Sequence, residues 1–297
     1  MRITADNLTL RYGDTVALDA LTVDLPAGSI YGLLGRNGSG KTSLLSLIAG
    51  HRRPTSGTLT VGGADPFENA AVMGGTAFVR DVVDATDAEP ARAALRFAAD
   101  LRPTFDLDYA HDLAGQFGLP LGKGVGGLSR GQKSALGVVL GLAARTPLTI
   151  FDEAYLGMDA PSRYLFYRLL LDDYVADPRT VILSTHLIEE VANLFEKVLV
   201  IDRGRLVAYD ETDELRGRGV TVTGPAAAVD AFVAGRTVLG EQRLGGTRAA
   251  TVYGRLDAAD RARAADAGLD LGPVGLQDLF VHLTGSAAEP RAQEAHR

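Results

Sequence analysis

The sequence of 297 residues contains no cysteine. Disulfide bonds are therefore excluded, and so are metal sites that depend on cysteine thiolates. The absence of cysteine fits a reducing compartment such as the cytoplasm, although cysteine-free proteins also occur elsewhere. Hydrophobic residues make up 46% and charged residues 23% of the chain, which is the usual balance of a globular protein.

The sequence also lacks a long apolar run. Its most apolar stretch, residues 135–144, ends at Arg145 after about ten residues, whereas a helix needs about 20 to cross a bilayer. The first residues, MRITADNLTLRYGD, are interrupted by polar and charged side chains and show no apolar core of a signal peptide. We therefore expect that the chain, if it serves a membrane process, docks onto another protein.

An excess of basic residues is absent as well. The chain has 30 lysines and arginines against 37 aspartates and glutamates, which gives a net charge of −7. Proteins that bind nucleic acid need positive charge to contact the phosphate backbone. We therefore expect no nucleic acid among the partners of this protein.

The predicted elements up to residue 215 alternate between strands and helices. Residues 85–120 have the composition and spacing of helices, and no internal repeat is apparent. Alternation of this kind is typical of an α/β domain whose mainly parallel sheet is covered on both faces. The elements predicted around this sheet are strands at 29–34, 148–151, 181–184 and 198–201, and helices at 42–49, 161–175 and 187–195.

The composition changes after about residue 215. A short, glycine-rich basic segment at 216–219 resembles a linker. We expect a small α+β domain over residues 216–285, with short strands near 220–223, 236–239 and 251–253 and a helix containing Leu276, Leu279, Phe280 and Leu283. Residues 286–297 are polar, and we expect a disordered tail there.

A glycine-rich loop follows the predicted strand 29–34. Its sequence, GRNGSGKT from Gly35 to Thr42, fits the pattern of a phosphate-binding loop that lies between a strand and a helix. Glycines let the backbone turn its N–H groups toward phosphate oxygens, and the helix start adds a positive dipole end. Lys41 suits the β- and γ-phosphates of a nucleotide, and the Thr42 hydroxyl suits Mg²⁺. The predicted nucleotide-binding residues are Gly35, Asn37, Gly38, Ser39, Gly40, Lys41, Thr42 and Ser43.

Two adjacent carboxylates follow the predicted strand 148–151. In parallel α/β sheets, ligands bind at the carboxyl ends of the strands, where Asp152 and Glu153 stand. Neighbouring residues of a strand point to opposite sides, so the two carboxylates need not share one role. We predict that Asp152 holds Mg²⁺ and that Glu153 orients and polarises the attacking water. An acidic pair exposed to solvent is the alternative interpretation.

His186 stands just after the predicted strand 181–184, at the same edge of the sheet. An imidazole there can donate a hydrogen bond to the γ-phosphate, and we predict this role for His186. A packing or surface role is the alternative, because a single histidine carries little information by its spacing.

These motifs together resemble the ABC ATPase family. Residues 128–132, LSRGQ, are similar to the signature of that family, and LGMD ending at Asp159 is similar to its D-loop. The ordered set covers roughly residues 2–215. The resemblance implies a P-loop ABC ATPase fold that has a parallel core sheet, an antiparallel β subdomain and a helical signature subdomain. It also implies ATP and Mg²⁺ as ligands.

The resemblance implies a head-to-tail dimer in which one subunit completes the ATP site of the other. Tyr12 stands where the family has an aromatic residue that stacks on adenine, and Asp159 would communicate between the two sites. The residues expected to face the partner's ATP are Leu128, Ser129, Arg130, Gly131 and Gln132.

The sequence departs from the family pattern at the Q-loop. The expected glutamine, which reads Mg²⁺ and contacts the membrane subunit, is missing after residues 76–79, and Arg80-Asp81 stands there. Asp81 is the best candidate for this position because a carboxylate can ligate Mg²⁺. Ala154 also replaces a proline that is frequent after the catalytic glutamate.

The implied function is an ATPase subunit on the inner face of the cell membrane that energises transport through separate permease subunits, with export as the expected direction. Its cassette partner would be a second copy or a different chain. The runs SALGVVLGLAARTPLTIFDEAYLGMDA and ILSTHLIEEV resemble ATPases of GntR-regulated bacterial exporters linked to cell-wall-active antibiotics.

Two other functions compete with this one. A soluble ABC ATPase acting on ribosomes or DNA is disfavoured by the single cassette, the lack of heptad repeats and the acidic composition. A catalytically silent regulatory cassette is disfavoured because Lys41, Asp152, Glu153 and His186 are all present. The segment after residue 219 either stabilises packing or the dimer, or senses a ligand, and no motif there supports the second interpretation.

Overall fold

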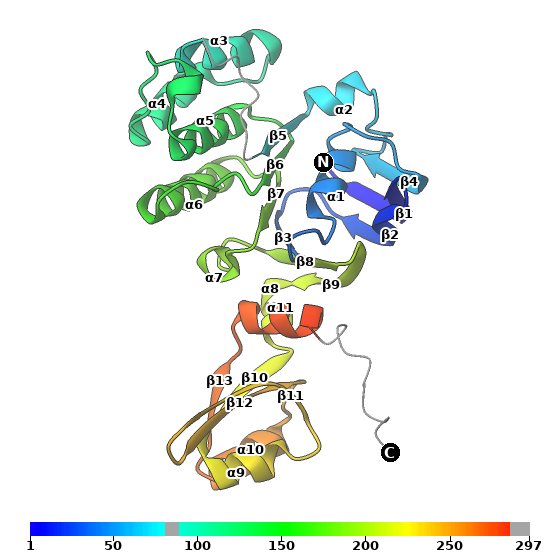
Figure 1. Ribbon diagram of the computed structural model, residues 1–297, viewed down its shortest axis with the longest axis vertical. Coiled ribbons are helices and arrows are strands. Elements are labelled where there is room, and N and C mark those ends of the chain that lie inside the picture. Colours follow the sequence, from blue (N-terminus) through cyan, green and yellow to red (C-terminus); the bar gives the residue numbers. More distant parts are fainter. Residues whose placement is uncertain (81–88, 286–297) are drawn as a thin grey trace. The chain divides into compact units, whose positions relative to one another are not determined.

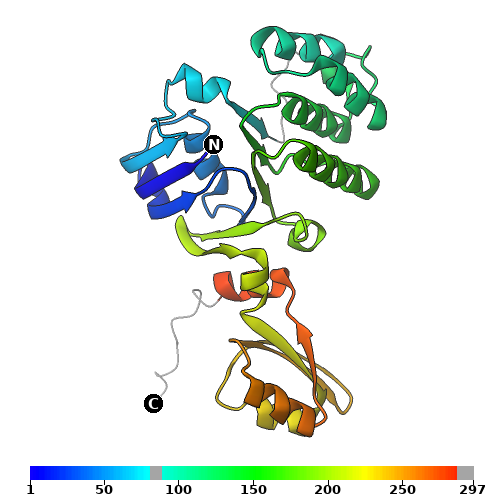
Figure 2. The same ribbon diagram turned by 180° about the vertical axis from the view of Figure 1, so that it is seen from behind.

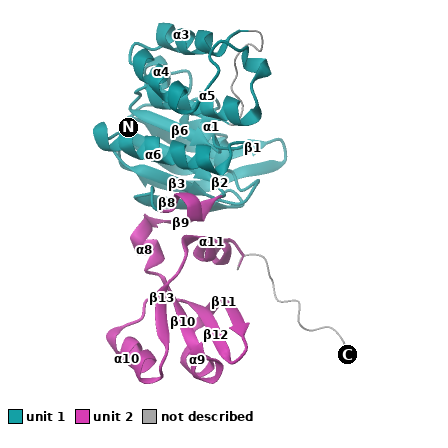
Figure 3. Cartoon of the chain, turned by 90° about the vertical axis from the view of Figure 1, so that its left-hand side faces the viewer, with its two compact units in different colours: residues 1–186, 193–206 teal, residues 187–192, 207–297 magenta. Residues whose placement is uncertain are grey.

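The computed structural model describes residues 1–80 and 89–285, which form two compact units (Figure 3). The first unit comprises residues 1–186 and 193–206. The second comprises residues 187–192 and the chain from residue 207 onward. Two predictions, the disordered tail at 286–297 and Asp81 as a metal ligand, lie outside the described residues.

The first unit contains an antiparallel sheet of three strands in the order β2-β1-β4. Its strands are β1 (Ile3–Tyr12), β2 (Thr15–Leu25) and β4 (Ser56–Val61). The N-terminal half of β1 alternates between buried and exposed side chains, because one face of this sheet packs on the core and the other meets solvent.

The larger sheet has six strands in the order β5-β6-β7-β3-β8-β9, and the neighbours from β5 to β8 are parallel. All residues of β3, β6 and β7 are buried, which explains why their sequences are apolar runs rather than alternating patterns. The predicted parallel sheet is therefore confirmed. Its strands are β3 (Ile30–Leu34), β5 (Thr76–Arg80), β6 (Leu148–Asp152), β7 (Thr180–Thr185), β8 (Lys197–Asp202) and β9 (Arg205–Glu211).

Helices cover this sheet on both faces. Helix α1 (Lys41–Ile48) contacts β2 and β4 of the small sheet and β6 of the large one, whereas α5 (Arg130–Ala143) packs on β5 and β6. Figures 1 and 2 show α5 and α6 on the opposite side of the large sheet from α1. The other helical elements of this unit are α2 (Ala70–Gly74), α3 (Ala91–Leu101), α4 (Leu107–Gln116), a short 3₁₀ turn (Val125–Gly127) and α6 (Ala160–Ala176).

Three strands of the large sheet end at the same edge. Leu34 of β3 pairs with Thr185 of β7, and Asp152 of β6 pairs with Ser184 of β7. The phosphate-binding loop, the two carboxylates and His186 follow these strand ends. The topology therefore brings together segments that are far apart in sequence.

The second unit contains a β-α-β-β-α-β arrangement whose antiparallel sheet has the order β11-β12-β10-β13. This is the ferredoxin-like topology. Val220 near the start of β10 pairs with Pro273 at the end of β13. Residues from both helices and from the sheet form one core, which includes Val222, Val229, Val252 and Ala264. The elements are β10 (Gly219–Pro225), α9 (Ala226–Val233), β11 (Thr237–Leu244), β12 (Thr247–Tyr253), α10 (Ala258–Asp266) and β13 (Asp270–Pro273).

Three further helices belong to the second unit: α7 (Ile188–Val191), α8 (Thr212–Arg216) and α11 (Leu276–Gly285). Helix α11 packs against α7 and α8. Among the described residues, no helix combines the length and the apolar character that crossing a bilayer requires.

Candidate functional site

The loop between β3 and α1 is shaped by glycine. Gly40 caps α1 with a φ of +108°, in the left-handed region where other residues are strained. A Cβ atom on Gly40 would lie 2.5 Å from the carbonyl oxygen of Ala17, so the loop also needs glycine there for space. The loop can therefore approach a ligand with its backbone exposed.

Lys41 is buried at the start of α1. Its ammonium nitrogen donates hydrogen bonds to the carbonyl oxygens of Gly35 at 2.8 Å and Arg36 at 3.4 Å. The same nitrogen lies 3.4 Å from Oε1 of Glu153. The loop thus holds a positive charge in contact with the carboxylate that follows β6.

Ser184 of β7 holds the C-terminal end of β6, where Asp152 and Glu153 stand. Asp152 is buried, and its Oδ1 atom accepts a hydrogen bond from the Ser184 hydroxyl at 2.5 Å. The backbone N–H of Glu153 donates to the same hydroxyl oxygen at 3.0 Å. Glu153 has a φ of +50°, a strained conformation of the kind that clusters at functional sites.

His186 lies on the other side of Glu153 from Lys41. Its Nδ1 atom lies 3.4 Å from Oε2 of Glu153, while Oε1 of that carboxylate faces Lys41. The structure therefore brings Lys41, Glu153 and His186 together from three separate segments. Such an arrangement can bind phosphate, polarise a water molecule and donate a hydrogen bond in one place.

A pocket of about 490 Å³ lies over the phosphate-binding loop. Arg80, at the end of β5, also lines it and pairs in register with Asp152. No role was predicted for Arg80 from the sequence, although its place beside the missing Q-loop glutamine was an available signal. The predicted site residues that line the pocket are Asn37, Gly38, Gly40, Lys41, Thr42, Ser43, Asp152 and Glu153.

The donor set of this pocket fits Mg²⁺. Thr42 and Asp152 supply a hydroxyl and a carboxylate, and Mg²⁺ prefers few protein oxygens together with water and phosphate oxygens. The described residues contain no group of three or more His, Cys, Asp or Glu side chains that would form an all-protein metal cage. The Ser39 hydroxyl is buried and has no hydrogen-bond partner among the described residues, but Ser39 does not line this pocket.

Tyr12 lies at the end of β1, and its side chain is 41% exposed. Its hydroxyl is 3.5 Å from the Ser43 hydroxyl in α1, and the guanidinium of Arg52 lies 4.9 Å from the centre of its ring. The ring is thus held near the first turn of α1 with an accessible surface, as stacking on a base requires.

The signature residues start α5 and do not line the pocket over Lys41. Ser129 and Gln132 form a capping box: each side chain hydrogen-bonds the backbone N–H of the other residue, at 3.2 and 3.0 Å. A Cβ atom on Gly131 would lie 2.7 Å from the carbonyl oxygen of Gly157, so only glycine allows this close packing. Leu128 is buried, whereas Ser129 and Arg130 are exposed.

Asp159 caps the start of α6. Its Oδ1 atom accepts a hydrogen bond from the backbone N–H of Ser162 at 2.9 Å. Hydrogen bonds from the side chain and the backbone of Ser162 lower the pKa of the Asp159 carboxyl. Asp159 is exposed and does not line the pocket over Lys41.

Comparison with known proteins connects this geometry to a family. The family model described as "ABC transporter" matches residues 18–156. The chain is 30% identical to the daunorubicin resistance ATP-binding protein DrrA2 of Streptomyces coeruleorubidus, over 99% of this chain and 98% of that protein. It is 28% identical to the ABC transporter ATP-binding protein YtrB of Bacillus subtilis (strain 168), over 69% of this chain and 70% of that protein.

Solved structures show the same fold. The chain superposes with a TM-score of 0.66 on the ATP-binding subunit of an ABC transporter, at 22% identity over 73% of this chain and 92% of that chain. A nucleotide-free cassette of an ABC transporter superposes with a TM-score of 0.61, at 17% identity over 71% of this chain and 92% of that chain. The chain therefore belongs to the ABC transporter family: it is a transporter ATPase that binds and hydrolyses ATP, not a soluble ATPase of ribosomes or DNA.

Proposed function

We propose that this chain energises an exporter from the inner face of the membrane, as one cassette of a dimer that works with separate membrane-spanning subunits. The observation that carries the proposal is the convergence of Lys41, Glu153 and His186 at one sheet edge. Relatives named for daunorubicin resistance and for Nod factor export support the direction of transport. The resemblance to GntR-regulated antibiotic-response ATPases remains part of this proposal.

Each residue of the pocket has a role in the proposed reaction. Lys41 binds the β- and γ-phosphates, and the carboxylate of Glu153 accepts hydrogen bonds from the attacking water and polarises it. Thr42 and Asp152 would hold Mg²⁺, which neutralises phosphate charge when bound. Asp81 is proposed as a further ligand. His186 donates a hydrogen bond to the γ-phosphate, and Tyr12 stacks on the adenine ring.

The start of α5 is proposed to complete the ATP site of the partner subunit. Ser129 and Arg130 are exposed there, at the N-terminus of a helix of 14 residues. The unpaired N–H groups and the dipole of such a helix end attract phosphate. Asp159 would link the two sites. The partner in this arrangement is a second copy of the chain or another cassette.

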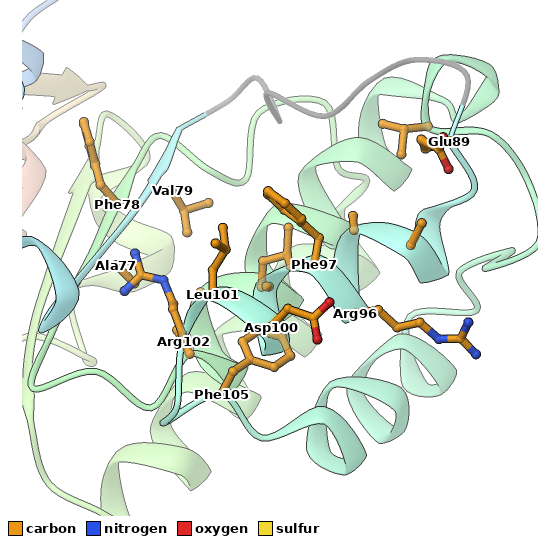
Figure 4. Close-up of a pocket in the computed structure, with 17 residues that line it drawn as sticks. Ala77, Phe78, Val79, Glu89, Arg96, Phe97, Asp100, Leu101, Arg102 and Phe105 are labelled. Carbon is orange, nitrogen blue, oxygen red and sulfur yellow. The ribbon is translucent and has the colours of Figure 1, made fainter.

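A membrane subunit is proposed to contact the pocket shown in Figure 4. This pocket, of about 690 Å³, lies between β5, α3 and α5 and is lined mainly by apolar side chains. Phe97 and Leu101 of α3 line it although each is 64% exposed, and Figure 4 shows Leu101 beside Val79 of β5. Exposed apolar surface of this kind marks interaction sites, and β5 leads into the Q-loop position.

The ferredoxin-like part of the second unit is proposed to stabilise packing or the dimer. Its interior is a closed apolar core, and no catalytic motif was found in its sequence. A ligand-sensing role is the alternative.

Capture of membrane partners tests the proposal. The Glu153→Gln variant, tagged and incubated with Mg-ATP, is used to retrieve proteins from detergent-solubilised membranes of the native host, with Lys41→Ala as the control. We expect a polytopic membrane protein to be enriched with Glu153→Gln over Lys41→Ala. Recovery of ribosomal or DNA-repair proteins without a membrane partner would contradict the proposal.

A further inference from the structure

The phenolic oxygen of Tyr155 is the centre of a hydrogen-bond network beside His186. Tyr155 is buried in the turn that follows β6. Its oxygen accepts hydrogen bonds from the Thr185 hydroxyl at 2.9 Å and from the backbone N–H of His186 at 3.1 Å. The same oxygen lies 3.2 Å from Nδ1 of the His186 ring. These contacts connect the turn after β6 to the end of β7.

The hydrogen-bond capacity of a phenol gives these contacts a direction. A phenolic oxygen donates one proton and accepts up to two hydrogen bonds. Thr185 and the backbone of His186 both donate to this oxygen, so Tyr155 is the donor in its contact with Nδ1 of the ring. Nδ1 is then an acceptor, and the proton of the neutral imidazole lies on Nε2.

Glu153 competes for the same ring nitrogen. Its Oε2 atom lies 3.4 Å from Nδ1 of His186, and a carboxylate would require the imidazole proton on Nδ1. The two neighbours therefore favour opposite tautomers. The backbone N–H of His186 donates to the phenol and keeps it 3.2 Å from Nδ1, whereas the carboxylate of Glu153 is shared with Lys41.

We infer that Tyr155 is a positioning residue that fixes the tautomer of His186 and so keeps Nε2–H available for a phosphate oxygen. This inference rests on the proposed contact of His186 with the γ-phosphate. The opposite tautomer would present the lone pair of Nε2 to an anionic oxygen, which is repulsive. The catalytic machinery thus extends to a buried side chain that touches the histidine without touching the substrate.

The tautomer is measured directly by nuclear magnetic resonance. The full-length protein is labelled with ¹⁵N-histidine, and the spectrum is recorded about two pH units above the ordinary imidazole pKa of about 6.5. The chain has five histidines, and the signal that disappears in His186→Gln identifies His186. We expect the Nε2–H pattern in the wild type. In Tyr155→Phe, Glu153 is the remaining neighbour of Nδ1, and we expect a shift toward Nδ1–H.

Turnover provides the second readout. We expect Tyr155→Phe to lower the kcat for ATP about tenfold with little change in KM, because a positioned hydrogen bond is lost. In the His186→Gln background, the same substitution should have little further effect, because Tyr155 acts through the imidazole. Tyr31→Phe is the matched control: Tyr31 is also buried, and its hydroxyl donates to the carbonyl oxygen of Pro26 at 2.6 Å. It should leave kcat unchanged.

Two results would overturn the inference. One is an Nδ1–H tautomer of His186 in the wild type; this measurement does not depend on the folding of any variant. The other is an Nε2–H tautomer that persists in Tyr155→Phe. If His186→Gln retains wild-type turnover, the proposed role of His186 fails instead, and the tautomer spectra still decide the role of Tyr155.

Discussion

Oε1 of Glu153 lies 3.4 Å from Nζ of Lys41, so the proposed catalytic base and the proposed phosphate-binding residue form an ion pair. The carboxylate also faces His186 through its other oxygen. Glu153 therefore joins the first residue of α1 to the residue that follows β7. Replacing Glu153 with glutamine removes the charge and keeps the shape of the side chain. This substitution can therefore separate ATP binding from ATP hydrolysis.

Glu153→Gln should bind ATP and nearly abolish hydrolysis. The amide keeps the size of the side chain but cannot polarise water, and loss of a general base lowers turnover by about 10²–10⁴-fold. Nucleotide binding and steady-state turnover are measured on the same preparation. Glu68→Gln is the control, because Glu68 is an exposed carboxylate that pairs with Arg53 on the surface. Wild-type turnover of Glu153→Gln would show that another residue is the base.

Tyr12→Ala should raise the ATP concentration that half-saturates the protein. Stacking on a flat ring contributes on the order of 1 kcal/mol, which corresponds to about a fivefold weaker affinity. Nucleotide affinity is measured by a fluorescent ATP analogue and by competition with ATP. Tyr164→Ala is the matched control, because Tyr164 is an exposed tyrosine of α6, away from α1. An unchanged affinity of Tyr12→Ala contradicts the stacking role.

Phe97→Asp should prevent capture of the membrane partner while the isolated chain keeps its ATPase activity. The substitution places a charge among the apolar side chains of the pocket in Figure 4, and burying that charge under a partner costs free energy. Val175→Asp on α6 is the control, because Val175 is 72% exposed and does not line this pocket. Equal recovery of the partner with both variants would place the contact elsewhere.

Asp173→Asn should destabilise the first unit strongly. Asp173 of α6 is buried and forms ion pairs with both Arg145 and Arg179. Removing its charge leaves the buried guanidinium of Arg179 without the carboxylate with which it pairs, and the loss of one partner of a buried ion pair costs about 3 kcal/mol. Urea unfolding measures this change. Asp19→Asn breaks the exposed pair with Arg205 and should cost less than about 1 kcal/mol. Equal losses for the two variants would refute the buried network.

Alkaline pH should weaken the fold through Tyr109. Burial, with the nearby carboxylate of Asp173 as the next cause, raises the pKa of Tyr109 to about 12 from 10.0. The folded protein thus holds this proton more tightly than the unfolded chain. Its contribution to stability is complete below about pH 10 and is lost as the pH rises to about 12. The absorbance of tyrosinate should show a late titration that is missing in Tyr109→Phe; overlapping curves would contradict this assignment.

Local motifs made much of the site predictable. The phosphate-binding loop, the pair Asp152-Glu153 and His186 each follow an apolar strand, and parallel strands end at one edge, so their convergence could be inferred. The hydrogen bonds around Tyr155 and those of Ser184 could not be inferred from the sequence, because they depend on the register of β6 against β7. Register is a tertiary property that single residues do not encode.

One predicted helix is shorter in the structure, and two helices of the structure were not predicted, for identifiable reasons. The apolar spacing after Leu187 predicts a helix to Phe195, but α7 ends at Val191. Phe195 instead packs so closely on Gly32 of β3 that a Cβ there would lie 2.4 Å from its ring. Helices α9 and α10 were missed, because alanine-rich segments such as 226–233 carry little apolar periodicity, and their place is set by the sheet they cover.

The pairing of Val220 with Pro273 places the two ends of residues 219–273 next to each other. The chain enters the sheet at β10 and leaves it at β13, and these two ends lie side by side. Residues 219–273 therefore form a segment whose ends are adjacent. Segments of this kind tolerate replacement, because exchanging one requires no rerouting of the flanking chain. Grafting a different ferredoxin-like module between α8 and α11 is thus a route to chimeric proteins that keep the ATP-hydrolysing half intact.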